Sequence, residues 1–132
     1  MSTEEIDEAE GTAPVYFVDE LHLKPGCLDA FLAALNERYV PGATARGQNL
    51  LHTLVTPPTL TGIVSGVVPQ SVILIWQIDG VAGFWGVRSQ NATSEVAEWW
   101  AECETFIHSR TRRVAAEPSA IAGLDALGRI NA

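Results

Sequence analysis

Glu20, His22 and His52 are the residues of this chain best suited to proton transfer. Glu20 and His22 lie two positions apart in a stretch that alternates like a β-strand, which would place them side by side on one face. A carboxylate beside an imidazole can raise the pKa of the histidine and hold one tautomer, as a general acid or base requires. The alternative is a structural ion pair at an interface between two copies of the chain.

His52 lies between Leu51 and Thr53 in an otherwise apolar segment that also favours a strand. If His22 and His52 face one cavity, one can remove a proton from a substrate while the other donates one, with Glu20 orienting its neighbour. A histidine that only packs or is solvated is the alternative reading of His52.

Two histidines and a carboxylate are also a known set of metal ligands. Neither the HxH nor the HxxxH spacing occurs here, and Cys27 and Cys103 show no CxxC spacing. Cys27 at a helix start could be a nucleophile, but no base lies near it in sequence, so a packed cysteine is favoured. The sequence has no phosphate loop or dinucleotide fingerprint. We therefore expect no metal and no cofactor.

Aromatic residues and arginines could form a pocket for a flat molecule. Trp76 and Trp85 could wall it, while Trp99 and Trp100 point in different directions on one helix. A hydrogen bond to a substrate oxygen could come from Tyr16 or Tyr39. Plain packing is the alternative for all these side chains. Four arginines are candidates for binding an anionic group of a ligand: Arg46, Arg88, and Arg110 or Arg112. The alternative for each is a solvated surface arginine.

Four strands and three helical segments would position these residues. The strands are predicted over residues 15–24, 49–56, 71–78 and 110–116. A helix should follow Pro25-Gly26, carry a stripe of apolar residues and stop at Pro41-Gly42; the stripe consists of Leu28, Phe31, Leu32, Leu35 and Tyr39. A short helix is expected over 81–89, and a longer one should begin near Thr93 and run to His108. Residues 59–70 are interpreted as a hairpin-like flap.

Leu21 and Leu23 should face the helices, because they lead into the helix residues that pack on the sheet. That places Tyr16, Glu20 and His22 on the opposite face of the sheet. The strand over 71–78 is apolar on both faces and is therefore expected at the centre of the sheet.

The 132 residues suit one domain, predicted over 13–117, with an acidic disordered tail over 1–12 and a short C-terminal tail over 118–132. The net charge is −8, and no basic stripe occurs, so nucleic acid is not expected as a partner. Neither a signal peptide nor a membrane-length apolar run is present. We expect a cytoplasmic protein with no membrane partner.

Two β-α-β units in tandem predict an α+β fold with a four-stranded antiparallel sheet and helices on one face. The other face would remain uncovered in a chain this short. A low charged share of 18% is consistent with additional buried surface. We therefore predict a homodimer with two sheets facing one another and a cavity between them.

Three motifs resemble the dimeric α/β-barrel superfamily of ferredoxin-like βαββαβ proteins, which includes antibiotic-biosynthesis monooxygenases, NIPSNAP-type proteins and small polyketide cyclases. The motifs are residues 21–26 (LHLKPG), 39–42 (YVPG) and 73–76 (ILIW), the last followed by Glu98-Trp99-Trp100. The resemblance implies a dimer that binds small, often aromatic, molecules. Haem degradation is disfavoured, because the first strand has no asparagine and His108 lies at the far end of the second helix.

The resulting hypothesis is a cofactor-independent enzyme for proton transfer on a small aromatic or polyketide-like molecule: a lyase, isomerase or cyclase. In it His22 and His52 are acid and base, Glu20 orients, and Tyr16, Tyr39, Arg46, Trp76 and Trp85 bind the substrate. The alternatives are a cofactor-free monooxygenase and a non-catalytic small-molecule binding protein.

Overall fold

Residues 13–56 and 70–121 are described by the computed structural model. The elements follow in the order β1 (Val15–Leu23), α2 (Leu28–Ala34), η1 (Leu35–Tyr39), α3 (Val40–Ala45), β2 (Gln48–Val55), β3 (Ser71–Ile78), α4 (Gly80–Asn91), α5 (Ser94–Cys103) and β4 (Ile107–Ala116). The predicted acidic tail, nearly all of the predicted flap and most of the predicted C-terminal tail lie outside the described residues.

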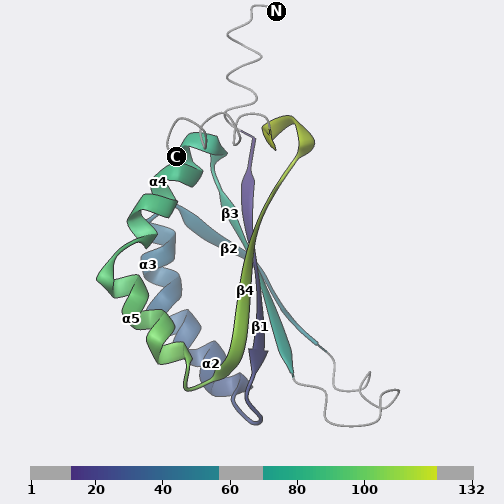
Figure 1. Ribbon diagram of the computed structural model, residues 1–132, viewed down its shortest axis with the longest axis vertical. Coiled ribbons are helices and arrows are strands. Elements are labelled where there is room, and N and C mark those ends of the chain that lie inside the picture. The colour runs from purple at the N-terminus through teal and green to yellow at the C-terminus, as the bar shows by residue number, and fades with distance from the viewer. Residues whose placement is uncertain (1–12, 57–69, 122–132) are drawn as a thin grey trace, which may run out of the picture.

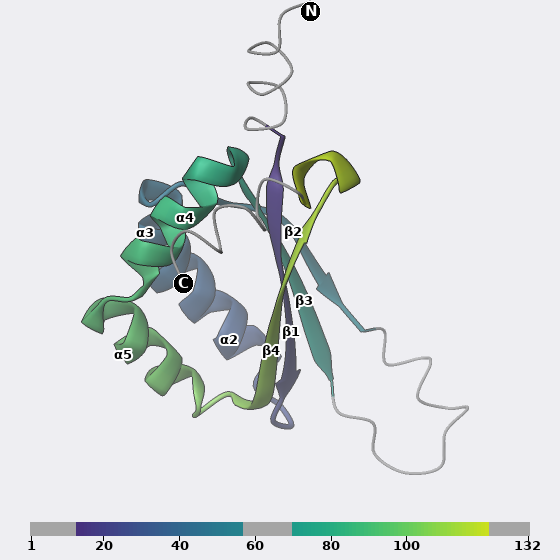
Figure 2. The ribbon, with the colours of Figure 1, turned by 45° about the horizontal axis from the view of Figure 1, so that its top comes forward.

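The four strands form one antiparallel sheet in the order β2-β3-β1-β4. The helices that connect the strands, from α2 to α5, lie on one side of it, with α5 beside the edge strand β4 (Figure 1). A second view shows that no helix crosses the other side of the sheet; a short helical turn over 118–121, after β4, lies at its end (Figure 2). The predicted ferredoxin-like α+β fold is confirmed, as is the central position of β3. No helix in the described part of the chain is long and apolar enough to cross a membrane.

Strict alternation divides the first strand between the two sides of the sheet. Its odd-numbered residues, from Val15 to Leu23, are buried beneath the helices, and its even-numbered residues are only half-buried. Strand β3 alternates in the same way, with Val72, Leu74, Trp76 and Ile78 buried. The predicted orientation of Leu21 and Leu23 is therefore confirmed.

The first helical region does not stop at Pro41-Gly42 as predicted, but continues to Ala45. The wider π turn of η1, in which the Val40 amide donates to the Leu35 carbonyl, precedes Pro41. Pro41 therefore stands at the beginning of α3, where a missing N–H costs no helical hydrogen bond. Gly47, with φ of 91°, then turns the chain into β2.

The last helix is shorter than predicted, because α5 ends at Cys103 and β4 begins at Ile107 rather than at Arg110. The Thr105 hydroxyl and amide both donate to the Glu102 carbonyl and close the final turn. Phe106 and Ile107 still pack on the core, from the turn and the strand. The spacing of these two residues, which predicted a longer helix, arises because both are packed on the core and not because they are helical.

Candidate functional site

The predicted pair Glu20 and His22 lies on the side of the sheet without helices. Oε1 of Glu20 is 3.9 Å from Nε2 of His22, and Nη2 of Arg113 is 3.8 Å from Oε2 of Glu20. The other ring nitrogen of His22, Nδ1, is 3.0 Å from the hydroxyl of Ser71, which is not among the predicted site residues. These polar side chains are part of a half-exposed surface and not of an enclosed pocket.

His52 lies on the same side of the sheet but far from His22. The register pairs His52 with Ile75, and Ile75 with Val18. His52 is thus two strands across from His22 and four residues along, about 16 Å away at ordinary strand spacing and rise. The predicted acid–base pair does not form within one chain, and the alternative set of three metal ligands does not form there either. The described residues contain no group of three or more potential ligands placed to hold a metal ion.

Trp76 and Tyr39 do not face the same side as His22, so their predicted place in a cavity between two sheets is wrong. Trp76 is fully buried between the sheet and the helices, and the Tyr39 ring meets it edge-on with centroids 5.5 Å apart. The reason is strand parity: Trp76 lies on the same face of β3 as Leu74 and Ile78, which point toward the helices. The predicted binding residues are therefore divided between two surfaces.

A buried carboxylate lies at the centre of the helix-covered side. Asp19 is 2% exposed and accepts two hydrogen bonds from Arg112, Nε to Oδ1 at 2.6 Å and Nη2 to Oδ2 at 2.8 Å. The indole Nε1 of Trp76 donates to Oδ2 at 2.9 Å. Burial alone would lower the pKa of Arg112, but hydrogen bonding to Asp19 and its charge raise that pKa above the usual value. Arg112 therefore stays charged, and the pair is neutral as a whole.

A second chain of polar contacts connects the helices behind this pair. Nε2 of the buried Gln48 is 3.4 Å from the Tyr39 hydroxyl, and its Oε1 accepts from Asn91 Nδ2 at 3.0 Å. Nε of Arg46 donates to Asn91 Oδ1 at 2.9 Å. The predicted ligand residue Arg46 thus has a structural role at the end of α4, where it also lies over the Tyr39 ring.

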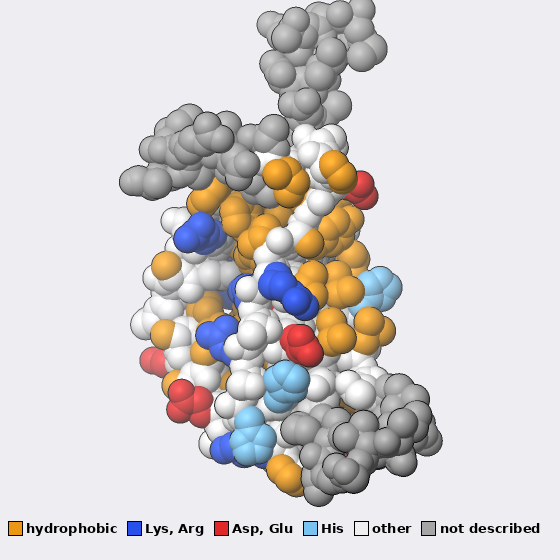
Figure 3. Space-filling view, turned by 45° about the vertical axis from the view of Figure 1, so that its right-hand side comes forward, with side chains coloured by type: hydrophobic (Ala, Val, Ile, Leu, Met, Phe, Trp, Pro, Cys, Tyr) orange, Lys and Arg blue, Asp and Glu red, His pale blue; other side chains and the backbone are white. Residues whose placement is uncertain are grey.

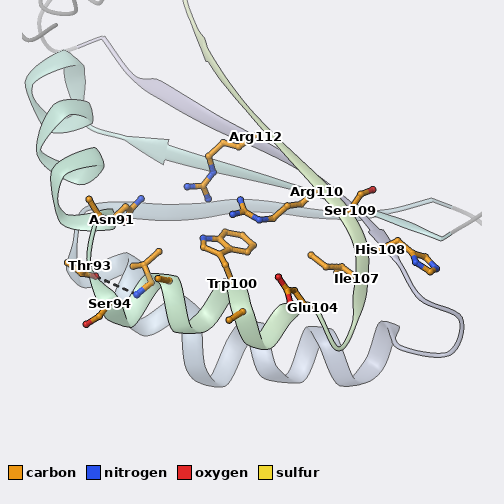
Figure 4. Close-up of a pocket in the computed structure, with 14 residues that line it drawn as sticks. Asn91, Thr93, Ser94, Trp100, Glu104, Ile107, His108, Ser109, Arg110 and Arg112 are labelled. Atoms are coloured by element: carbon orange, nitrogen blue, oxygen red, sulfur yellow. Dashed lines mark hydrogen bonds between the residues drawn. The ribbon is translucent and has the colours of Figure 1, made fainter.

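A groove of about 960 Å³ opens between α5 and β4. Figure 4 shows Trp100 reaching toward the strand from α5, and Glu104 from the turn after it; Arg110 and Arg112 reach from the strand toward Trp100. The guanidinium carbon of Arg110 is 3.7 Å from the centroid of the Trp100 ring, and that of Arg112 is 5.6 Å away. On its other side, Arg112 lies 4.4 Å from the Phe17 ring centroid. The Trp100 indole and two arginine side chains thus line one concave surface.

The remaining predicted binding residues lie elsewhere. Tyr16 pairs with Gln77 on the side of the sheet without helices. Trp85 packs edge-on against Phe84 on α4, beneath the Arg88 guanidinium, and does not line the groove. One signal could have revealed the centre of the site: Asp19 is the only acidic residue at a helix-facing position of an otherwise apolar strand face.

Comparisons with known proteins bear on the fold. No protein-family model matches the chain, and no curated protein matches it in sequence. A NIPSNAP family protein of unknown function from Agrobacterium tumefaciens superposes with a TM-score of 0.60 at 12% identity, over 80% of this chain and 89% of that one. An uncharacterized NIPSNAP domain protein from Burkholderia xenovorans gives 0.58 at 10% identity, over 78% and 93%. The predicted resemblance to NIPSNAP-type proteins is confirmed at the level of the fold.

Substitution of one partner in the buried ion pair should destabilise the fold strongly. Asp19→Leu and Arg112→Met should each lower the free energy of unfolding by about 3–5 kcal/mol, because each leaves an uncompensated charge. The double variant Asp19→Leu/Arg112→Met should recover most of that loss. Urea unfolding of all three proteins measures the coupling. Additive losses in the double variant would contradict a paired charge.

The two cysteines should differ in reactivity. Burial, and next the charge of Glu102, raise the pKa of Cys103 to about 12. At pH 8 only about one Cys103 in ten thousand would be a thiolate, while Cys27 is partly exposed. Ellman's reagent should therefore titrate one thiol per folded chain and two in urea. Rapid reaction of both thiols in the folded protein would contradict the buried, protonated Cys103.

Proposed function

We propose that this protein is an enzyme that binds a small, flat organic molecule in the groove between α5 and β4 and transfers a proton on it. The substrate is aromatic or polyketide-like, and the reaction is of the isomerase or lyase class. The observation that supports this proposal most strongly is the convergence of Trp100, Arg110 and Arg112 on one concave surface. The NIPSNAP neighbours support the fold and leave the reaction open.

The dimensions and walls of the groove fit such a ligand. A volume of about 960 Å³ is within the range of small-molecule sites, and the indole of Trp100 offers an apolar face. The strand wall is held by the bidentate bond of Arg112 to Asp19. A side chain fixed in this way loses little entropy when a ligand binds, which favours affinity.

Glu104 is the proposed proton acceptor. It follows the last turn of α5, and Figure 4 shows its carboxylate beside Trp100 on the groove side, whereas His108 points away. Its backbone carbonyl accepts a hydrogen bond from Lys24 Nζ at 2.8 Å, which fixes the main chain there. Glu104 would remove a proton from carbon next to a carbonyl group and return it at another atom of the same substrate. Isomerisation by this route needs no oxidant and no second reactant.

We also propose that a second copy of the chain covers the side of the sheet without helices. Figure 3 shows apolar side chains gathered there, with acidic, basic and histidine side chains between them. Val18, Ile73 and Ile75 are only half-buried in the single chain. Both signs of charge occur within one small area, Glu20 beside Arg113. A two-fold interface of this kind would be self-complementary, which favours a homodimer.

Removal of the Glu104 carboxylate should abolish proton transfer and spare binding. The assay is solvent-deuterium exchange into aromatic ketones and keto acids, phenylpyruvate among them, followed by NMR. Glu104→Gln should reduce the exchange rate by about a hundredfold or more, because a general base is lost. The matched control is Glu98→Gln, an exposed glutamate of α5 that does not line the groove. Equal rates for Glu104→Gln and the wild type would overturn the role of Glu104, and binding without any exchange would favour a non-catalytic binding protein.

If two copies pair through the uncovered sheet face, a charged residue introduced on that face should prevent dimerisation. Sedimentation at micromolar concentration should give twice the chain mass of 14.2 kDa for the wild type. Leu54→Glu should give a monomer, because Leu54 shares the face of Ile73. Val114→Glu is the matched control, since both residues are 48% exposed and Val114 pairs with the helix-facing Phe17. A wild-type monomer, or dimers for both variants, would contradict this interface.

A further inference from the structure

We infer that the ligand of the groove carries one negative charge and that Arg110 binds the group that carries this charge. This inference rests on the proposed function and adds the charge of the substrate to it. Three charged side chains of the described lining determine the charge balance: Arg112, Arg110 and Glu104.

Arg112 does not contribute a net charge to the groove. Two of its nitrogens are bonded to the two oxygens of Asp19, which is buried directly behind it. The pair is neutral, and its geometry is the bidentate one in which guanidinium and carboxylate satisfy each other. Arg112 can still present its remaining N–H groups and its flat face, but its charge is already compensated.

Arg110 has no such compensation among the described residues. They include no carboxylate in an ion pair with it, and its guanidinium carbon lies over the Trp100 ring, 3.7 Å from the ring centroid. Contact with an aromatic face occupies one face of the guanidinium, and within residues 13–56 and 70–121 the N–H groups at its edge have no side-chain hydrogen-bond partner. A ligand carboxylate or phenolate at that edge could accept two hydrogen bonds from them, while the indole keeps the arginine in place.

Glu104 sets the upper limit on the ligand's charge. Its carboxylate lies on the same wall as Trp100 and faces the groove (Figure 4). A ligand with one anionic group can place that group at Arg110 and its apolar part toward Glu104. A second anionic group at the far end of a flat ligand would approach the Glu104 carboxylate, and like charges repel. The groove therefore selects a monoanion over both a neutral molecule and a dianion.

Three probes that share a naphthalene ring and differ in charge test the charge selection: 2-naphthoate, 2-naphthamide and 2,6-naphthalenedicarboxylate. Isothermal titration calorimetry should show that wild-type protein binds 2-naphthoate about tenfold or more tightly than either of the others. Arg110→Gln should weaken 2-naphthoate by about tenfold and change the amide less than twofold. Arg88→Gln is the matched control, because Arg88 is exposed and also lies over an indole, that of Trp85, but does not line the groove. It should bind all three probes as the wild type does.

The outcomes separate this inference from the proposal on which it rests. Equal affinity for 2-naphthoate and 2-naphthamide, with Trp100→Ala weakening both, would overturn the charge selection and leave the groove as the ligand site. Tightest binding of the dicarboxylate would also overturn the inference. Binding that Trp100→Ala leaves unchanged would overturn both the inference and the groove.

Discussion

The burial of one carboxylate determines much of this structure. Asp19 is at a central position of the sheet beneath the helices, where an unpaired charge would be very costly. Its compensation comes from two other strands, through Arg112 of β4 and Trp76 of β3. The polar requirement of a single side chain therefore links three neighbouring strands and places a guanidinium at the wall of the groove between α5 and β4.

That requirement also explains why the two sides of the sheet differ. On the helix-covered side, the fixed Arg112 lies between the Phe17 and Trp100 rings, and Arg110 stacks on Trp100 from the same edge strand. On the other side, Glu20, His22 and Ser71 lie on a half-exposed surface without walls. Concavity, aromatic area and an uncompensated cation coincide at the groove. The sheet face has the features of a contact between two copies instead.

The sequence predicted the position of a side chain correctly where its hydrophobic pattern allowed only one orientation of the strand. Alternation in the first strand predicted which side Glu20 and His22 occupy, because only one of its faces is mainly apolar. The strand of Trp76 is apolar on both faces, so its pattern could not show which side of the sheet the indole occupies.

The distance between His22 and His52 depends on strand order and register, which neither local segment encodes. Asp19 and Arg112 are 93 residues apart, and only the folded sheet brings them together. Pro41 was misleading because the preceding π turn removes the usual conflict of proline with a helix.

The central claim is that ligands bind between α5 and β4 and not on the uncovered face of the sheet. A crystal structure of the protein grown with 2-naphthoate tests it most directly. The account predicts electron density for the ligand against Trp100, with its carboxylate at the edge of the Arg110 guanidinium. Density between two sheets, beside His22 and Glu20 and with an empty groove, would contradict it.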